Sequence, residues 1–197
     1  MINTIIFDLS EVLLTGLKGT DEKISSMLKM DKGRLSNILY GDTFNELMEG
    51  KLTETDFWNK IMMMSNVNVD ADMLNTITRD NFKEIEGMRN LINLLRLNYK
   101  LGLLSNHARE WIEYCEDKFR YESLFEVNLY SYEVGLKKPN PKIFKLMLTR
   151  LGVKADNCLF IDDNEENVFM ASKLGIKAIR FHTSKKLIEE LKLLNIL

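Results

Sequence analysis

The first apolar run of the chain is short, and it stops on a carboxylate. Ile5, Ile6 and Phe7 follow one another directly, and Asp8 comes next. A short, wholly apolar strand is typical of a parallel sheet that is buried on both faces. In such sheets the functional crevice lies beyond the carboxyl ends of the strands. The pattern therefore predicts a buried first strand with Asp8 at the rim of the sheet.

Between about residue 20 and residue 85, apolar positions recur at helical spacing. They are Ile24, Met27, Leu28, Leu35, Ile38, Leu39, Phe44, Leu47 and Met48. Thr53 and Asp56 have the spacing of a capping box before a further apolar run, and Asp70 or Asp72 could start the last helix. We expect about four helices here. We also expect the consecutive Met62, Met63 and Met64 to pack in their core rather than to line an adaptable binding surface.

From residue 86 onwards, apolar strands alternate with amphipathic helices. Strands are predicted at residues 99–104, near 125–130, and at 158–161 and 178–181. Helices are predicted at residues 88–98, around Trp111, at 143–151, in the stretch that ends at Leu174, and at 187–194. This alternation implies a parallel sheet with right-handed crossovers. The predicted organisation is an α/β core of residues 1–15 and 86–197, with residues 16–85 inserted as a helical unit.

Composition narrows the classes of function. The chain has 197 residues, 45% of them hydrophobic and 28% charged, with a formal net charge of −2. Such a balance offers no basic surface for nucleic acid and no polybasic patch for a membrane. No apolar run is long enough for a membrane span. Cys115 and Cys158 lack metal-like spacing, so we expect both to pack in helix or strand, in a cytoplasmic and reducing environment.

Polar residues end three of the predicted strands. These endings are Asp8, Ser105-Asn106 and Asp162-Asp163, and Lys137-Lys138-Pro139 stands in a loop between two strands. One such ending is common in any α/β protein. Three of them together with a lysine loop predict one convergent site.

These residue types suit phosphoryl transfer. A carboxylate can attack a phosphoryl group and form an acyl-phosphate, which splits one displacement into two easier steps. A cation is needed, because the attacking anion and the phosphate otherwise repel each other. Carboxylates from two strand ends could hold Mg²⁺ through oxygen ligands. A hydroxyl and a lysine would bind the remaining phosphoryl oxygens as charge develops on them.

Four segments in order carry a family resemblance. They are Phe7-Asp8-Leu9-Ser10, Leu104-Ser105-Asn106, Gly135-Leu136-Lys137-Lys138-Pro139-Asn140-Pro141 and Phe160-Ile161-Asp162-Asp163-Asn164. Over nearly the whole chain they resemble the motifs of the haloacid dehalogenase superfamily, in its sugar-phosphate phosphatase-like branch. The resemblance implies a Rossmann-like parallel sheet core with helices on both faces and an inserted α-helical cap. It also implies a Mg²⁺-dependent hydrolase acting on a small phosphorylated metabolite.

The same resemblance implies a role for each matching position. Asp8 matches the nucleophile and a metal ligand, and the backbone carbonyl of Ser10 matches a second ligand. Asp163 matches the direct acidic ligand, and Asp162 the supporting position before it. Asn167 falls where many relatives carry another acid.

Two further segments match the groups that bind phosphate. Ser105 matches the phosphate-binding hydroxyl, with Asn106 beside it, and Lys138 matches the lysine that orients nucleophile and phosphate. The neighbouring Lys137 is expected to be solvated.

Ser10 is the main departure from the family pattern. Most phosphatases of the superfamily carry there a second aspartate that protonates the leaving oxygen, and losing a general acid typically costs about 10²–10⁴-fold in rate. Three hypotheses remain: a slow Mg²⁺-dependent phosphatase, a metal-independent haloacid dehalogenase, and a non-catalytic ligand-binding protein. The acidic pair Asp162-Asp163 favours the first, because facing carboxylates repel without a cation between them.

Several other polar residues receive plainer interpretations. Glu11 is next to the acid position but is expected to point elsewhere, and His107 is expected to be an exposed residue at a helix start. His182 is expected at the surface. Arg79, Arg109 and Glu46 could approach a substrate, although the sequence does not place them.

Overall fold

The computed structural model describes residues 1–197 and contains one five-stranded sheet in the order β3-β2-β1-β4-β5. The strands are β1 (Thr4–Phe7), β2 (Lys100–Ser105), β3 (Val127–Tyr130), β4 (Cys158–Asp162) and β5 (Lys177–Arg180). All four pairings are parallel. The chain builds outwards from β1 to β2 and β3, and then outwards on the other side to β4 and β5. The strand order therefore reverses at β1, and its carboxyl end is where such sheets bind ligands.

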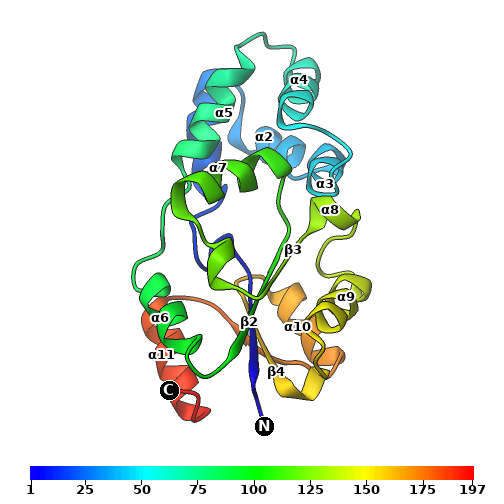
Figure 1. Ribbon diagram of the computed structural model, residues 1–197. Helices are drawn as coiled ribbons and strands as arrows, with labels where there is room; N and C mark the ends of the chain where they lie inside the picture. The colour runs from blue at the N-terminus through cyan, green and yellow to red at the C-terminus, as the bar shows by residue number, and fades with distance from the viewer.

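Helices cover both faces of this sheet, which confirms the predicted fold class. In Figure 1, α6 and α11 lie on one side of the strands, and α9 and α10 lie on the other. The helices of this part are α6 (Met88–Leu95), α7 (Arg109–Phe119), α8 (Ser131–Val134), α9 (Pro141–Leu151), α10 (Glu165–Lys173) and α11 (Ser184–Leu193). Short 3₁₀ turns occur at Glu122–Leu124 and Ala155–Asn157. The sequence pattern does not predict α8, because its single turn is too short to show periodicity.

A block of five helices lies beyond the carboxyl ends of the strands (Figure 1). They are α1 (Thr20–Leu28), α2 (Lys32–Leu39), α3 (Asp42–Met48), α4 (Glu54–Ser65) and α5 (Ala71–Asp80). The expected number of about four helices was too low, because the helical stretch between residues 20 and 48 is interrupted twice. Asp31 caps α2 by accepting a hydrogen bond from the Arg34 amide, and Gly41 separates α2 from α3. The capping box of Thr53 and Asp56 starts α4 as predicted.

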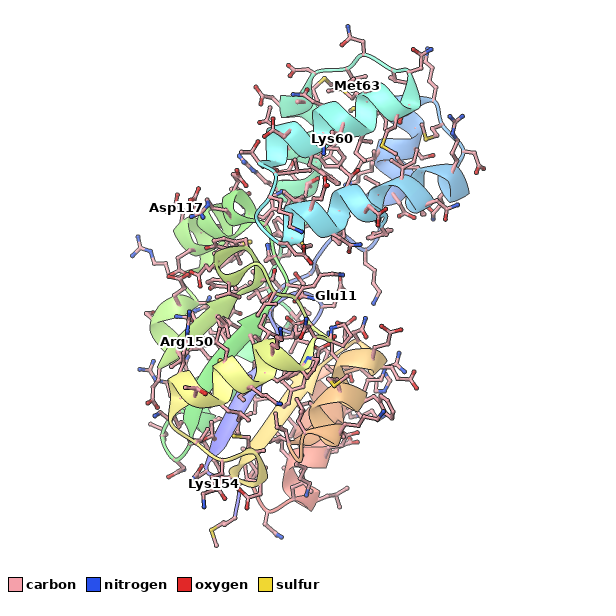
Figure 2. All side chains as sticks on the ribbon, turned by 90° about the vertical axis from the view of Figure 1, so that its right-hand side faces the viewer. Glu11, Lys60, Met63, Asp117, Arg150 and Lys154 are labelled. Atoms are coloured by element: carbon pink, nitrogen blue, oxygen red, sulfur yellow. The ribbon has the colours of Figure 1, made fainter.

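The three consecutive methionines do not share one environment. Met62 is buried, but Met63 is 82% exposed and Met64 is 54% exposed, so the expectation of a common core position was wrong for two of them. Successive residues of a helix point about 100° apart, so three in a row cannot all face inwards. Met63 lies at the end of the helical block that is remote from Glu11 (Figure 2).

The two chain segments that join the helical block to the sheet pair with each other. The Thr15 amide donates to the Lys83 carbonyl at 2.8 Å, and the Ile85 amide donates to the Leu13 carbonyl at 2.9 Å. The Asn81 side chain also donates to the carbonyl of Lys18 at 3.1 Å. The segment that leaves the sheet and the segment that returns to it therefore pair with each other in one short antiparallel connection.

The helical block and the sheet share one apolar core. A single cluster of 37 buried residues includes Ile5 and Phe7 of β1, Phe57 of α4 and Trp111 of α7. One buried carboxylate crosses the same interface: Glu54 accepts a hydrogen bond from the Trp111 indole at 2.6 Å and forms an ion pair with Arg79. These buried groups must keep their relative positions, because a buried charge that loses its partner destabilises the folded state.

Both cysteines are buried and unpaired, as expected from their spacing. Cys115 lies in α7 and Cys158 begins β4. No helix combines the length and the apolar character that crossing a membrane requires.

Gly50 brings the backbone of the helical block against Tyr132 of α8. Its φ is +71°, and a Cβ there would clash with the Tyr132 carbonyl oxygen. Gly152 has a similar φ of +67° but nothing within 4 Å of a Cβ. The two positions therefore separate backbone strain from a steric clash.

We predict that Gly50→Ala lowers the free energy of unfolding by about 1–3 kcal/mol more than Gly152→Ala does. Gly152→Ala should cost only the left-handed backbone strain, about 1–2 kcal/mol. Urea unfolding of the two variants and the native protein measures the difference. Equal losses in the two variants would contradict the close approach at Tyr132.

Candidate active site

The register of β1 and β4 brings two carboxylates together at the switch point of the sheet. Phe7 pairs with Ile161, and the Asp8 amide donates to the Ile161 carbonyl at 2.9 Å. Asp8 and Asp162 therefore leave neighbouring strand ends at the same level. Asp8 is 7% exposed and Asp162 is fully buried.

The ammonium group of Lys138 lies between these two carboxylates. Its Nζ is 2.8 Å from Asp8 Oδ1 and 2.7 Å from Asp162 Oδ2, and the side chain is buried. The Leu9 amide also donates to Asp8 Oδ1, at 2.7 Å. Both hydrogen bonds to Asp8 thus reach the same oxygen, and Oδ2 receives neither.

Asn106 fixes the backbone of Lys138. The Asn106 amide group donates to the Lys138 carbonyl at 2.9 Å, and its side-chain oxygen accepts from the Lys138 amide at 2.8 Å. The end of β2 therefore holds the loop that carries the lysine. The next peptide bond, between Lys138 and Pro139, is cis.

Asp162 is saturated by groups of its own neighbourhood. Besides Lys138, it accepts hydrogen bonds from the Asn164 amide at 2.8 Å and from the Asn167 side chain at 3.0 and 3.1 Å. Asn167 donates to this carboxylate, whereas an acid at that position would add a further negative charge. Asp162 is accordingly a positioning group for Lys138.

Asp163 completes a cluster of three carboxylates. Oxygen atoms of Asp8, Asp162 and Asp163 lie within 4.8 Å of one another, a set that could hold a metal ion. Asp163 is half-buried and its only side-chain partner is the exposed Lys18, at 3.3 Å. An exposed ion pair of this kind contributes little and leaves the carboxylate available. The three carboxylates offer oxygen donors, which suit a hard divalent cation such as Mg²⁺.

The electrostatics of the cluster demand positive charge. Burial raises the pKa of Asp8 to about 7; the Lys138 ammonium opposes this shift, and Asp162 and Asp163 add to it. Burial alone would lower the pKa of Lys138, but Asp162 and Asp8 outweigh it and hold that pKa above its ordinary value. Lys138 is therefore a permanent cation, and a second cation would favour the ionised form of Asp8.

Two hydroxyl groups stand near the strand ends. Ser105 is fully buried at the end of β2, and its Oγ has no hydrogen-bond partner. A buried hydroxyl without a partner is costly, so this one is poised to bind a ligand oxygen. Ser10 is half-buried and borders the adjacent cavity.

A cavity of about 280 Å³ opens beside these residues, between the strand ends and the helical block. Its polar border includes Ser10, Glu11, Asn106 and Asp163, and its apolar border comes from both the helical block and the region of α7. Glu11, labelled in Figure 2, lies at the junction of the two regions. Glu11 borders the cavity in a left-handed backbone conformation with φ of +60°, and its Oε1 accepts a hydrogen bond from the Gly16 amide at 2.8 Å.

The expectation of an exposed His107 was also wrong. The side chain is 2% exposed, borders the cavity and packs against Phe82 and Trp111. Its amide donates to Ser131 Oγ at 3.0 Å, and that hydroxyl bonds in turn to the Met48 carbonyl of the helical block. Burial lowers the pKa of His107 to about 4. His182, in contrast, is exposed as expected.

The remaining candidates are occupied elsewhere. Arg79 pairs with Glu54, Arg109 lies over the Tyr132 ring at 4.8 Å, and Glu46 pairs with Lys60 at 2.8 Å. None of the three borders the cavity. Lys137 is half-buried and donates to Asn45 of the helical block at 2.8 Å, so the expectation of a solvated side chain was wrong.

The apolar border of the cavity was not predicted from the sequence. Tyr40, Phe44, Phe82 and Trp111 lie there, and Lys18 reaches Asp163 from the same side. Each of these aromatics fits a helical core pattern, so periodicity alone gave no signal. The exposed position of Tyr40, 49% exposed at the end of α2, depends on how the block lies over the sheet.

Comparison with known proteins places this geometry in context. The profile described as haloacid dehalogenase-like hydrolase matches residues 5–181. The chain is 27% identical over 194 residues to D-ribitol-5-phosphate phosphatase of Bacteroides thetaiotaomicron, with 91% of this chain and 92% of that protein covered. It is 24% identical to drimenol cyclase of Aspergillus calidoustus, over 92% of this chain but 34% of that protein. The chain spans between 34% and 61% of the length of three curated relatives that it matches.

A solved structure gives the same result for the fold. The crystal structure of an HAD family enzyme from Bacteroides thetaiotaomicron, in complex with magnesium and inorganic phosphate, superposes with a TM-score of 0.81. The two chains are 25% identical, and the match covers 93% of this chain and 96% of the other.

The buried His107 predicts an acid-sensitive stability. Its pKa in the folded state, about 4, lies below the ordinary value of 6.5, so the unfolded chain takes up a proton first as the pH falls. We expect native protein to lose about 3 kcal/mol relative to His107→Gln between pH 7 and pH 4. Urea unfolding across that range measures it, and the comparison cancels the contribution of Asp8, which both proteins share. Parallel stability curves would contradict the assignment.

Proposed function

The chain belongs to the haloacid dehalogenase-like hydrolase family, and we propose that it is a Mg²⁺-dependent phosphatase of a small phosphomonoester. The observation that carries this proposal is the convergence of Asp8, Asp163 and the Lys138–Asp162 pair at one strand-order reversal. The phosphatase relative and the magnesium- and phosphate-bound structural relative support it. The phosphatase relative falls in the sugar-phosphate phosphatase-like branch that the sequence motifs resemble.

Asp8 would act as the nucleophile. Lys138 and the Leu9 amide both hold Oδ1, which leaves Oδ2 to attack phosphorus. Attack on the phosphomonoester breaks the bond between phosphorus and the leaving oxygen and forms an aspartyl-phosphate, which water then hydrolyses. The hydrogen bonds to Oδ1 orient the carboxylate, and orientation of this kind lowers the entropic part of the barrier.

The residues that would hold Mg²⁺ are Asp8, Asp163 and the backbone carbonyl of Ser10, with Asp162 in support. Bound there, Mg²⁺ would neutralise the facing anions and polarise a phosphoryl oxygen. Lys138 and the unpartnered Ser105 hydroxyl would bind other phosphoryl oxygens as their charge grows. Asn106 would act through Lys138, since both ends of its side chain are bonded to the lysine backbone.

Ser10 makes slow turnover the expected behaviour. A serine hydroxyl is a poor proton donor near neutral pH, so an alkoxide leaving group would depart without a general acid. The rival haloacid dehalogenation needs no such acid, but it also needs no metal. The three facing carboxylates favour the phosphatase over that rival, because they repel one another unless a cation lies between them. The oxygen of Asp8 that Lys138 and the Leu9 amide leave unengaged favours catalysis over ligand binding alone.

We propose the same division of labour that the motifs suggest. Residues 1–15 and 86–197 would form the catalytic core, and residues 16–85 would form a cap that closes the cavity over the strand ends. The cap would exclude water from the reacting groups, which strengthens the electrostatic interactions inside. The cavity residues that would close it include Tyr40, which directly follows α2, and Phe44 and Met48 of α3.

Replacement of the nucleophile should abolish turnover. We expect Asp8→Asn to reduce Mg²⁺-dependent phosphate release by more than about 10³-fold, because the amide cannot attack phosphorus. Phosphate release is measured on a panel of phosphorylated metabolites with Mg²⁺ and with a chelator. Asp117→Asn, at an exposed position of α7 distant from Glu11 in Figure 2, is the matched control. Halide release from haloacids in the presence of chelator would contradict the proposal.

Supplying the missing acid should accelerate the reaction. We expect Ser10→Asp to raise kcat for alkyl phosphates by about 10²-fold, since a carboxylic acid can protonate the alkoxide. The effect on p-nitrophenyl phosphate should be much smaller, because nitrophenolate leaves without a proton. Ser10→Asn controls for the change in size, and equal acceleration by both variants would argue against an acid role.

A further inference from the structure

We propose that the cavity beside Asp8 selects phosphomonoesters whose alcohol part carries an aromatic ring, in preference to polyol phosphates. This inference deepens the proposed phosphatase function and rests on it for the position of the phosphate. The groups that carry it are two sets of aromatic side chains that line the cavity, one on the helical block and one where the chain returns from that block and packs on α7.

The first set lies on the helical block. Tyr40 at the end of α2 and Phe44 of α3 pack edge to face, with ring centroids 5.5 Å apart. Phe44 is half-buried and Tyr40 is 49% exposed, so both retain ring surface that a ligand could cover. Phe44 also contacts the buried Phe57 ring at 6.2 Å, which fixes its position.

The second set also lines the cavity. Phe82, His107 and Trp111 form a cluster with centroid separations of 5.6, 5.8 and 6.2 Å. All three are buried. His107 is uncharged at neutral pH because burial lowers its pKa, so this border has no net charge. An aromatic lining of this kind favours a planar apolar group, since ring pairs add attraction beyond the area that they bury.

The polar border is largely committed to partners within the chain. Both ends of the Asn106 side chain bond to Lys138, and Asn164 Oδ1 accepts from the amides of α10 at 2.8 and 3.3 Å. Glu11 Oε1 accepts from the Gly16 amide at 2.8 Å, and Lys18 pairs with Asp163. On this border the Ser10 hydroxyl and the second carboxylate oxygens of Glu11 and Asp163 remain for the several hydroxyls of a polyol, and a hydroxyl without a partner is costly to bury.

The size of the cavity restricts the ligand further. Pockets for drug-sized ligands typically measure about 300–1,000 Å³, and this cavity holds about 280 Å³. A single ring on a short linker fits that volume. Ligands of several fused rings or a dinucleotide do not.

A kinetic comparison of matched esters tests the proposal. 2-Phenylethyl phosphate, glycerol 3-phosphate and ribitol 5-phosphate are all primary alkyl phosphates, so their leaving groups have similar chemistry. We expect kcat/KM to be at least about tenfold higher for the phenylethyl ester, by analogy with the discrimination that hydrophobic pockets achieve. Equal or higher values for either polyol phosphate, or for phosphocholine, would overturn the proposal.

A binding measurement separates this inference from the proposed function. Titration calorimetry in Mg²⁺ compares 3-phenylpropylphosphonate with 3,4-dihydroxybutylphosphonate, two analogues that no phosphatase can hydrolyse. Tighter binding of the phenyl compound supports the aromatic pocket even if no ester is turned over, a result that would reject only the phosphatase. Turnover with no preference in either assay rejects only the pocket.

Variants of the cavity border complete the test. We expect Tyr40→Ala and Phe44→Leu to reduce several-fold the ratio of kcat/KM for 2-phenylethyl phosphate to kcat/KM for glycerol 3-phosphate. Phe44→Leu keeps an apolar side chain against Phe57, so the helical block should remain folded. Phe169→Ala, at a 58% exposed ring of α10 outside the cavity, is the control. An unchanged preference in both cavity variants would contradict the assignment.

Discussion

The buried ammonium of Lys138 is the group on which the geometry of the strand ends depends. It contacts carboxylates from β1 and β4, and its own backbone is bonded to Asn106 at the end of β2. Removing this cation would leave two buried carboxylates side by side without a neutralising charge. Such an arrangement lowers the free energy of unfolding by several kcal/mol. The same contacts therefore tie three strand ends together and orient the Asp8 carboxylate. Structural and chemical requirements coincide in one side chain.

Much of the sheet and of this cluster could be predicted from the sequence because both are encoded locally. Buried strands such as β1 and β4 are short apolar runs, and Asp8 and Asp162 stand where those runs stop. The burial of His107, the exposure of Met63 and the border formed by Tyr40 are different in kind. They depend on how the helical block lies over the sheet, and no spacing along the chain encodes that orientation.

The interface between the helical block and α7 combines apolar packing with directional contacts. Phe57 and Trp111 are packed edge to face at 6.5 Å, and the Trp111 indole donates to the buried Glu54 carboxylate. Apolar contact alone tolerates sliding, whereas a buried carboxylate with two donors accepts only a narrow range of positions. The orientation of the block, and with it the shape of the cavity, is therefore set by Glu54 as much as by the surrounding rings.

The paired connection at Thr15 and Lys83 means that the chain leaves the sheet and returns to it at one point. A segment whose ends already lie side by side can be lengthened, shortened or replaced at little additional entropic cost, and the register of β1 with β2 is unaffected. In the phosphatase that we propose, selectivity for the alcohol and the chemistry at phosphorus could thus diverge separately in evolution. The surfaces that such an exchange would uncover, on α7 around Trp111, on α8 at Ser131 and Tyr132, and at Lys137, would have to change together with a replaced segment.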